Sequence, residues 1–126
     1  MPPFLKDLDF HILVVEDEPE LHEVIAAALR YDGHRPTFTT KKATALTLIS
    51  SLKLDLVIAD MGLPDGLGTE VVQRAAAVGI PSIVMSGNPS LMAHLDTKRV
   101  SYLCKPFRFE QFRQEVRNAL RPAGAA

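Results

Sequence analysis

Residues 57–66 read VIADMGLPDG, and this stretch decides how the rest of the chain is interpreted. An apolar run ends abruptly on the carboxylate of Asp60, and a loop rich in glycine and proline follows at once. The pattern is typical of a strand that delivers an acid to the edge of a sheet. Asp is also common at helix caps and in turns, so a capping role for Asp60 is the alternative. The choice depends on which other side chains reach the same edge.

Composition places the chain among ordinary globular proteins. Its 126 residues suit one domain with a single core, and 47% of them are apolar while 23% are charged. The net charge of −1 gives no basic field for nucleic acid, and no apolar run is long enough to cross a bilayer. We therefore expect a cytoplasmic protein without direct contact to nucleic acid or membrane.

Cys104 is the single cysteine, which excludes an intramolecular disulfide and favours a reducing compartment. Because it ends an apolar run, we expect a buried small side chain there rather than a reactive thiol.

Apolar runs alternate five times with amphipathic helix patterns. The expected strands cover residues 11–15, 35–39, 54–59, 82–85 and 100–104, and the expected helices cover 19–31, 41–52, 69–78, 90–96 and 109–121. The inner stripe of the first helix contains Leu21, Val24, Ile25, Ala28 and Leu29, and that of the last helix contains Phe109, Phe112, Val116 and Leu120. Residues 1–9 form an irregular lead-in, 10–121 the domain and 122–126 a frayed tail.

This order predicts an α/β fold: a doubly wound parallel sheet with helices on both faces and right-handed crossovers. In such sheets the ligand or reaction site lies beyond the carboxyl ends of the strands. The first strand ends on Glu16 and Asp17, the third on Asp60, the fourth on Ser86 and the fifth on Lys105. If these strands are neighbours, three carboxylates, a hydroxyl and an ammonium group converge on one edge.

Such a group has restricted chemistry. Three adjacent carboxylates repel one another, so a cation is expected among them. The ligands are all oxygens without His or Cys, which favours a hard ion, Mg²⁺ first. Asp60 is then a candidate nucleophile toward phosphorus that forms an acyl phosphate, while Lys105 and Ser86 stabilise the charge of the transferring group.

Each of these residues also has a purely structural interpretation. Glu16 and Asp17 suit a helix cap, where they complement the helix dipole. Ser86 suits an ordinary turn, and Lys105 suits a solvated surface position. The coincidence of all five at the ends of four strands favours the functional interpretation.

Together with these residues, four short motifs resemble the receiver domains of two-component response regulators. In chain order they are Val15-Glu16-Asp17-Glu18, residues 60–68 (DMGLPDGLG), Ser86-Gly87 and Lys105-Pro106-Phe107. The match covers about residues 12–120. The resemblance implies a flavodoxin-like (βα)5 fold with the five-stranded order 2-1-3-4-5.

The resemblance also implies roles for individual residues. Asp60 would receive a phosphoryl group from a sensor histidine kinase or histidine phosphotransfer protein, and Mg²⁺ would be the cofactor. Asp17 and Asp60 would ligate the metal directly, Glu16 through water, and Gly62 through its backbone carbonyl. Ser86 and Tyr102 would form the switch pair, with a half-buried strand residue as the alternative for Tyr102. A cis peptide would join Lys105 to Pro106.

The output implied is a changed affinity for a downstream protein effector, by a monomer or weak dimer and without separate substrate turnover. Only 18 residues separate Ser86 from Lys105, so we expect the helix over 90–96 to be short or displaced. The length favours a stand-alone regulator, with a receiver cut from a longer protein as the alternative. Two further alternatives are a protein-binding pseudo-receiver that acts without phosphorylation and a phosphatase with an aspartyl nucleophile.

Overall fold

A computed structural model describes residues 9–88 and 100–121 of the chain. One parallel sheet has the strand order β2-β1-β3-β6-β7, and a small antiparallel hairpin of β4 and β5 stands beside it. The sheet strands are β1 (His11–Val15), β2 (Arg35–Thr39), β3 (Leu56–Asp60), β6 (Ser82–Ser86) and β7 (Val100–Cys104), and the hairpin strands are β4 (Gly62–Leu63) and β5 (Gly66–Leu67). With the hairpin set aside, this is the predicted order 2-1-3-4-5.

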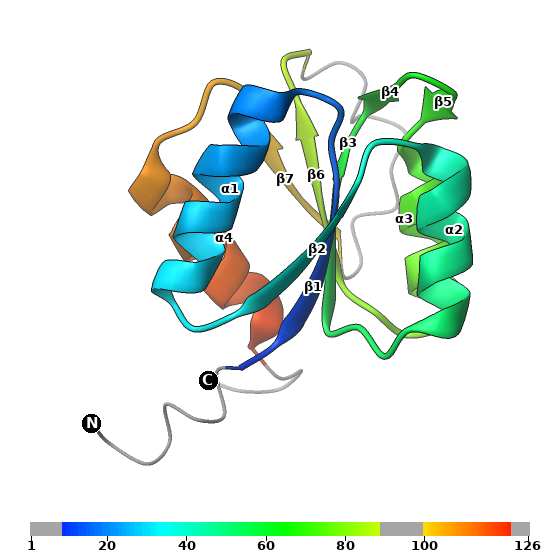
Figure 1. Ribbon diagram of the computed structural model, residues 1–126, viewed down its shortest axis with the longest axis horizontal. Helices are drawn as coiled ribbons and strands as arrows, with labels where there is room; N and C mark the ends of the chain where they lie inside the picture. The colour runs from blue at the N-terminus through cyan, green and yellow to red at the C-terminus, as the bar shows by residue number, and fades with distance from the viewer. Residues whose placement is uncertain (1–8, 89–99, 122–126) are drawn as a thin grey trace.

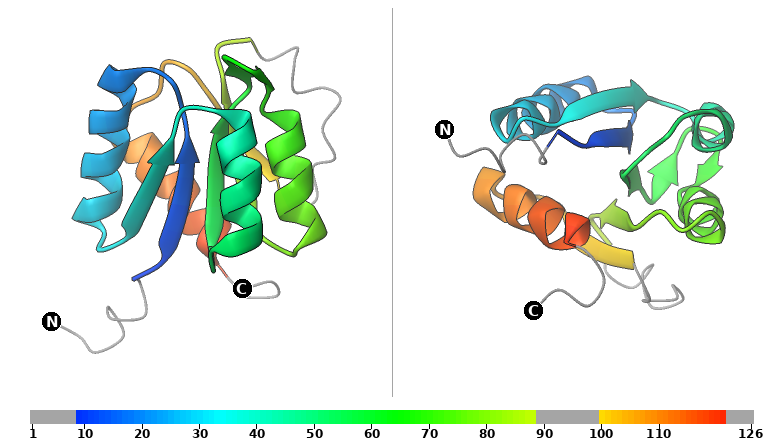
Figure 2. Two further views of the ribbon diagram at one scale, coloured as in Figure 1. Left: turned by 45° about the vertical axis from the view of Figure 1, so that its right-hand side comes forward. Right: turned by 90° about the horizontal axis from the view of Figure 1, so that it is seen from below.

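Helices cover both faces of the sheet, as Figure 1 shows. They are α1 (Pro19–Tyr31), α2 (Lys42–Ser51), α3 (Thr69–Ala77) and α4 (Phe109–Leu120). The view from below in Figure 2 places α1 and α4 on one face, and α2 and α3 on the other. The predicted doubly wound α/β fold is therefore confirmed.

Strand burial explains why the apolar runs became strands. Residues Ile12–Val15 of β1 and all of β3 are buried. Alternate residues point to opposite faces, so Leu13 and Val57 belong to the core under α2 and α3, whereas Ile12 and Ile58 belong to the core under α1 and α4. A strand that contributes to both cores needs an apolar side chain at every position, as expected for a central parallel strand.

Element ends follow recognisable local signals. Pro19 occupies the start of α1, and Gly33 with φ +83° follows its end. The expected helices end within a residue or two of the observed ones, but the third strand begins at Leu56 rather than Leu54. The Asp55 carboxylate accepts a hydrogen bond from the His11 backbone N–H at 2.8 Å, so this residue fastens the entry to the strand. The helix expected over 90–96 lies outside the described residues.

Three packing expectations were wrong. Val24 is 45% exposed, and Ala26, on the other side of Ile25, is buried instead. Phe109, at the first turn of α4, is 38% exposed. Cys104 is exposed, because alternation along β7 turns Leu103 into the core and Cys104 away from it.

Candidate functional site

The carboxyl ends of β1 and β3 bring three acids together. Glu16 and Asp17 follow β1 directly, and Asp60 is the last residue of β3. One carboxylate oxygen from each of the three lies within 4.8 Å of the others. Glu16 is fully buried and Asp60 is only 8% exposed, whereas Asp17 is exposed. The predicted convergence of these acids is present in the structure.

Lys105 is the cation at the centre of this cluster. Its Nζ lies 2.6 Å from Glu16 Oε1, 3.2 Å from Asp60 Oδ1 and 3.6 Å from Glu18 Oε1. The Lys105 backbone N–H donates to the Ser86 carbonyl at 2.9 Å, which fixes the start of the loop after β7. The following Lys105–Pro106 peptide bond is cis. The lysine therefore reaches the acids from a defined backbone position.

Burial dominates the electrostatics of Glu16. Loss of solvent raises its pKa from 4.5 to about 7, and the Asp60 charge adds to this, although the hydrogen bond with Lys105 opposes it. Burial alone would lower the pKa of Lys105, but its hydrogen bond and charge interaction with Glu16, and the charge of Asp60, raise it on balance. The second Glu16 oxygen accepts the Asp17 backbone N–H at 2.9 Å.

Negative charge remains in excess at this edge. Within residues 9–88 and 100–121, Lys105 is the only cation that forms an ion pair with the clustered acids. A single ammonium group cannot neutralise Glu16, Asp17 and Asp60 together. Oxygen ligands without His or Cys suit a hard divalent cation, and the exposed Asp17 leaves an open side for it. The residues present therefore fit a Mg²⁺ ion.

The β4–β5 hairpin determines how Gly62 is presented. Gly68 N–H donates to the Met61 carbonyl at 2.8 Å, and Leu63 pairs with Gly66 at the turn. Hydrogen-bonded and non-hydrogen-bonded residue pairs alternate along an antiparallel ladder. Gly62 and Leu67 face each other between the Met61–Gly68 pair and the turn, so they form a non-hydrogen-bonded pair. In this ladder pattern the Gly62 carbonyl is not used in a hydrogen bond to Leu67.

Ser86 ends β6, the strand beside β3, and within the described part of the chain no hydrogen bond joins Ser86 or Tyr102 to the acids. The Ser86 Oγ is held in its own turn, accepting the Asn88 N–H at 3.0 Å and lying 3.2 Å from the Asn88 carbonyl. Tyr102 sits on β7 opposite Val84 and is 49% exposed.

Three residues that contribute to the site were given no role by the sequence analysis. His22, one turn into α1, donates a hydrogen bond from Nε2 to the Glu16 backbone carbonyl. Glu18 adds a more distant partner for Lys105. At Gly68, an added Cβ would lie 2.2 Å from the Asp60 carbonyl oxygen. The i, i+6 spacing of Glu16 and His22 was a visible signal for the first, but nothing local signalled the Gly68 contact.

The family model of the response regulator receiver domain matches residues 12–117. This chain belongs to that family. The receiver is 31% identical over 118 residues to the probable transcriptional regulatory protein TcrX of Mycobacterium tuberculosis, covering 90% of this chain and 50% of TcrX. It is 34% identical over 115 residues to the KDP operon transcriptional regulatory protein KdpE of Escherichia coli, covering 88% of this chain and 51% of KdpE. The receiver thus spans about half the length of these curated relatives.

Solved receiver structures share the fold, and two of them were solved with magnesium. The receiver domain of the Pseudomonas aeruginosa sensor histidine kinase PA1611 was solved with magnesium in its active-site cleft. It matches with TM-score 0.77 and 25% identity over 89% of this chain and 98% of that one. TrrA of Thermotoga maritima, solved with Mg²⁺ and beryllium fluoride, matches with TM-score 0.79 and 26% identity, covering 88% of this chain and 99% of TrrA. Within residues 9–88 and 100–121, the receiver has no helix long and apolar enough to cross a bilayer.

Proposed function

We propose that this receiver, over residues 10–121, is a Mg²⁺-dependent phosphoacceptor switch in a two-component or phosphorelay pathway. Asp60 accepts the phosphoryl group from a phosphohistidine on a sensor histidine kinase or histidine phosphotransfer protein. The observation that carries the proposal is the excess of carboxylates around Lys105, with Asp60 at its centre. An unbalanced acidic cluster is costly unless a cation completes it, and the same cation would offset the charge that a phosphoryl group brings.

In the proposed transfer, an Asp60 carboxylate oxygen attacks phosphorus as the phosphorus–nitrogen bond of the donor breaks. The imidazole leaves with the bonding electron pair and takes a proton from solvent. Bound Mg²⁺ supplies positive charge to the transferring oxygens. The residues proposed to hold it are Asp17 and Asp60 directly, Glu16 through water, and the Gly62 carbonyl.

Lys105 has two proposed tasks. In the resting protein its ammonium group lies between Glu16 and Asp60, where it keeps the two buried carboxylates together. During transfer the Asp60 charge is shared with the phosphoryl group, so the same ammonium group stabilises the new oxygens. The Ser86 hydroxyl is proposed to leave its turn and donate to a phosphoryl oxygen, with Tyr102 turning inward as it moves. The exposure of Tyr102 leaves the ring free for that movement.

The proposed output is a change of affinity for a downstream protein effector, produced by a shift between two conformations. The relatives named above are transcriptional regulators, and we propose that this receiver segment contacts proteins rather than DNA, as a monomer or weak dimer. The single unpaired cysteine supports a cytoplasmic location. No separate substrate is turned over.

The test is phosphorylation by a small donor. Purified protein is incubated with acetyl phosphate, with Mg²⁺ or with EDTA, and intact mass is measured for wild type and Asp60→Asn. The proposal predicts one added phosphoryl group in wild type with Mg²⁺ only. An unmodified wild type under all conditions would support a pseudo-receiver, and steady turnover of phosphomonoesters would support a phosphatase.

A further inference from the structure

The N-terminus of α2 is capped by a residue from a distant loop. Its own N-cap position, Lys41, provides no side-chain cap. Instead, Asp65 at the tip of the β4–β5 hairpin accepts the Lys42 backbone N–H at 2.7 Å and the Ala43 N–H at 3.0 Å, one with each carboxylate oxygen. These two hydrogen bonds lower the pKa of Asp65. A carboxylate at this place also complements the helix dipole.

The Lys42 side chain reinforces the same junction. Its Nζ lies 3.1 Å from Glu70 Oε1, so the lysine bridges from α2 to the first turn of α3. On the way it crosses Gly66, where an added Cβ would lie 2.8 Å from Nζ. Gly66 also has φ +146°, which favours glycine. The hairpin tip is therefore fitted between α2 and α3.

The base of the same hairpin is fastened to the phosphoacceptor. Gly68 N–H donates to the Met61 carbonyl at 2.8 Å, and the backbone of Gly68 is packed on the Asp60 carbonyl. Leu63 is buried in the core under α2 and α3. Because this short hairpin is held both at its tip and at its base, a displacement of the tip also displaces its two strands.

We propose that Asp65 is a positioning residue for the acidic site. By capping α2 it holds the β4–β5 hairpin in the register that turns the Gly62 carbonyl toward the metal position beside Asp60. The inference rests on the proposed function, because it assigns Asp65 to the same metal site. It explains why a hairpin carboxylate, rather than a residue of α2 itself, caps this helix.

The test compares metal affinity with helix stability. Mg²⁺ is titrated in the absence of any phosphodonor, followed by backbone amide NMR, for wild type, Asp65→Ala, Asp65→Asn and Thr47→Gly. Thr47 is exposed in the middle of α2, and its hydroxyl donates to the Ala43 carbonyl at 3.3 Å, so its substitution weakens the helix but leaves Asp65 and the two capped N–H groups in place. Hydrogen exchange at the amides of residues 42 and 43 is measured in metal-free protein to report the cap itself.

Asp65→Ala is expected to weaken Mg²⁺ binding about tenfold, the effect typical of residues that orient metal ligands, and to speed exchange at both amides. Asp65→Asn keeps one acceptor oxygen, so its Mg²⁺ affinity and its amide exchange rates are expected to lie between those of wild type and Asp65→Ala. Thr47→Gly is expected to bind Mg²⁺ as wild type does.

The inference is overturned if Asp65→Ala speeds amide exchange but keeps wild-type Mg²⁺ affinity, since the cap would then serve the helix alone. Equal losses of affinity in Asp65→Ala and Thr47→Gly would overturn it as well. If wild type itself fails to bind Mg²⁺, both the proposed function and the inference fail. The wild-type titration therefore separates the two failures.

Discussion

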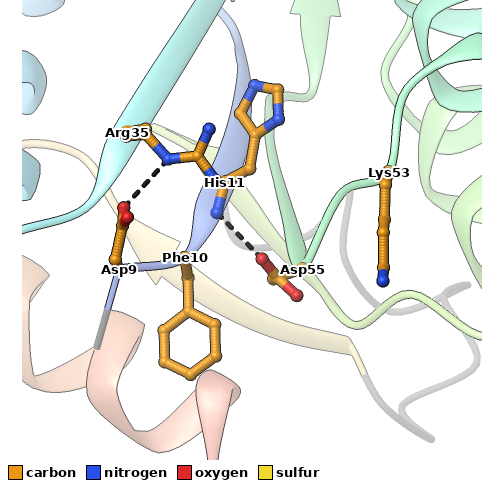
Figure 3. A pocket seen from close by; sticks show the side chains of 6 residues that line it. All are labelled: Asp9, Phe10, His11, Arg35, Lys53 and Asp55. Atoms are coloured by element: carbon orange, nitrogen blue, oxygen red, sulfur yellow. Dashed lines mark hydrogen bonds and ion pairs between the residues drawn. The ribbon is translucent and has the colours of Figure 1, made fainter. Parts of the chain in front are cut away.

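The two edges of the parallel sheet carry similar side chains but balance their charges differently. The amino edge has a pocket of about 470 Å³, and its lining residues, drawn in Figure 3, are Asp9, Phe10, His11, Arg35, Lys53 and Asp55. There Arg35 Nε pairs with Asp9 at 2.9 Å, and Asp55 accepts the His11 backbone N–H. At the carboxyl edge, Lys105 is the only cation of residues 9–88 and 100–121 that pairs with Glu16, Glu18 and Asp60.

This difference distinguishes charged side chains that only stabilise the fold from those that serve the proposed function. The acids of the amino edge are satisfied by an arginine and by a backbone donor, so that edge requires nothing further. The acids of the carboxyl edge are partly buried and exceed their cation, a state that folding alone does not favour. The hollow at the amino edge is a surface feature, whereas the acids of the carboxyl edge fit a cation and, in the proposed function, Asp60 receives a phosphoryl group there.

The largest effect is expected from removing Lys105, the cation that pairs with the acids of the carboxyl edge. Lys105→Ala should slow phosphorylation by acetyl phosphate roughly 100-fold or more, because the charge on the transferring oxygens loses a preorganised donor. Rates are measured by intact mass at saturating Mg²⁺. The matched control is Lys53→Ala at the amino edge, expected to react at the wild-type rate. Equal rates in wild type and Lys105→Ala would contradict the proposed role of Lys105.

The second effect is a pH dependence that belongs to Glu16. Burial raises its pKa from 4.5 to about 7, so the folded protein holds a proton there that the unfolded chain releases near 4.5. The stability contributed by this proton is present below pH 4.5 and is lost as pH rises through about 7. The loss is on the order of 3 kcal/mol at most.

Urea unfolding in EDTA between pH 5 and 8 measures this contribution as the difference between wild type and Glu16→Gln. As pH rises, the free energy of unfolding of wild type should fall relative to that of Glu16→Gln, because glutamine does not ionise. Added Mg²⁺ should counter the shift, since the metal favours ionised ligands. Parallel stability curves for the two proteins would refute this assignment of the buried charge.

The third effect concerns the close backbone contact behind Asp60. Gly68→Ala places a Cβ 2.2 Å from the Asp60 carbonyl oxygen, and should lower the free energy of unfolding by about 1–3 kcal/mol. Gly62→Ala in the same hairpin is the control, because an added Cβ there meets nothing within 4 Å. Both are measured by urea unfolding. Equal stability of the two variants would mean that the contact relaxes at no cost.

The smallest effect is expected at the amino edge. Arg35 and Asp9 form an exposed pair, with 64% and 55% of their side chains exposed. Arg35→Ala should change the free energy of unfolding by less than about 0.5 kcal/mol and leave phosphorylation unchanged. Thermal unfolding and the acetyl phosphate assay check both quantities. A large loss in either would show that the two edges are not as different as their charge balance indicates.

Much of the fold and of the acidic cluster was visible in the sequence. Residues 12–15 of β1 and 56–59 of β3 are all apolar because both faces of these strands are covered, and runs this short without a 3.6-residue period favour strands over amphipathic helices. Parallel strands place their carboxyl ends at one edge, so Glu16, Asp17 and Asp60 were expected to meet there if their strands were neighbours. The strand order itself came from the family resemblance, since nothing local specifies which strands are neighbours.

Contacts across the chain were not predictable in the same way. Cys104 ends an apolar run, yet it is exposed because β7 presents alternate residues to the core. The cap of α2 by Asp65 joins positions 22 and 23 residues apart, and neither segment signals it alone. The packing of Gly68 on Asp60 depends on a hairpin that only the folded loop reveals. Tertiary contacts decided these positions, and local patterns did not.

The most direct measurement locates the phosphoryl group on the chain. Protein treated with acetyl phosphate and Mg²⁺ is reduced with borohydride, which converts an aspartyl phosphate to homoserine, and its peptides are mapped by mass spectrometry. The proposed function predicts homoserine at position 60 only, and none when Mg²⁺ is replaced by EDTA. Reduction at another aspartate, or no homoserine with Mg²⁺ present, would contradict it.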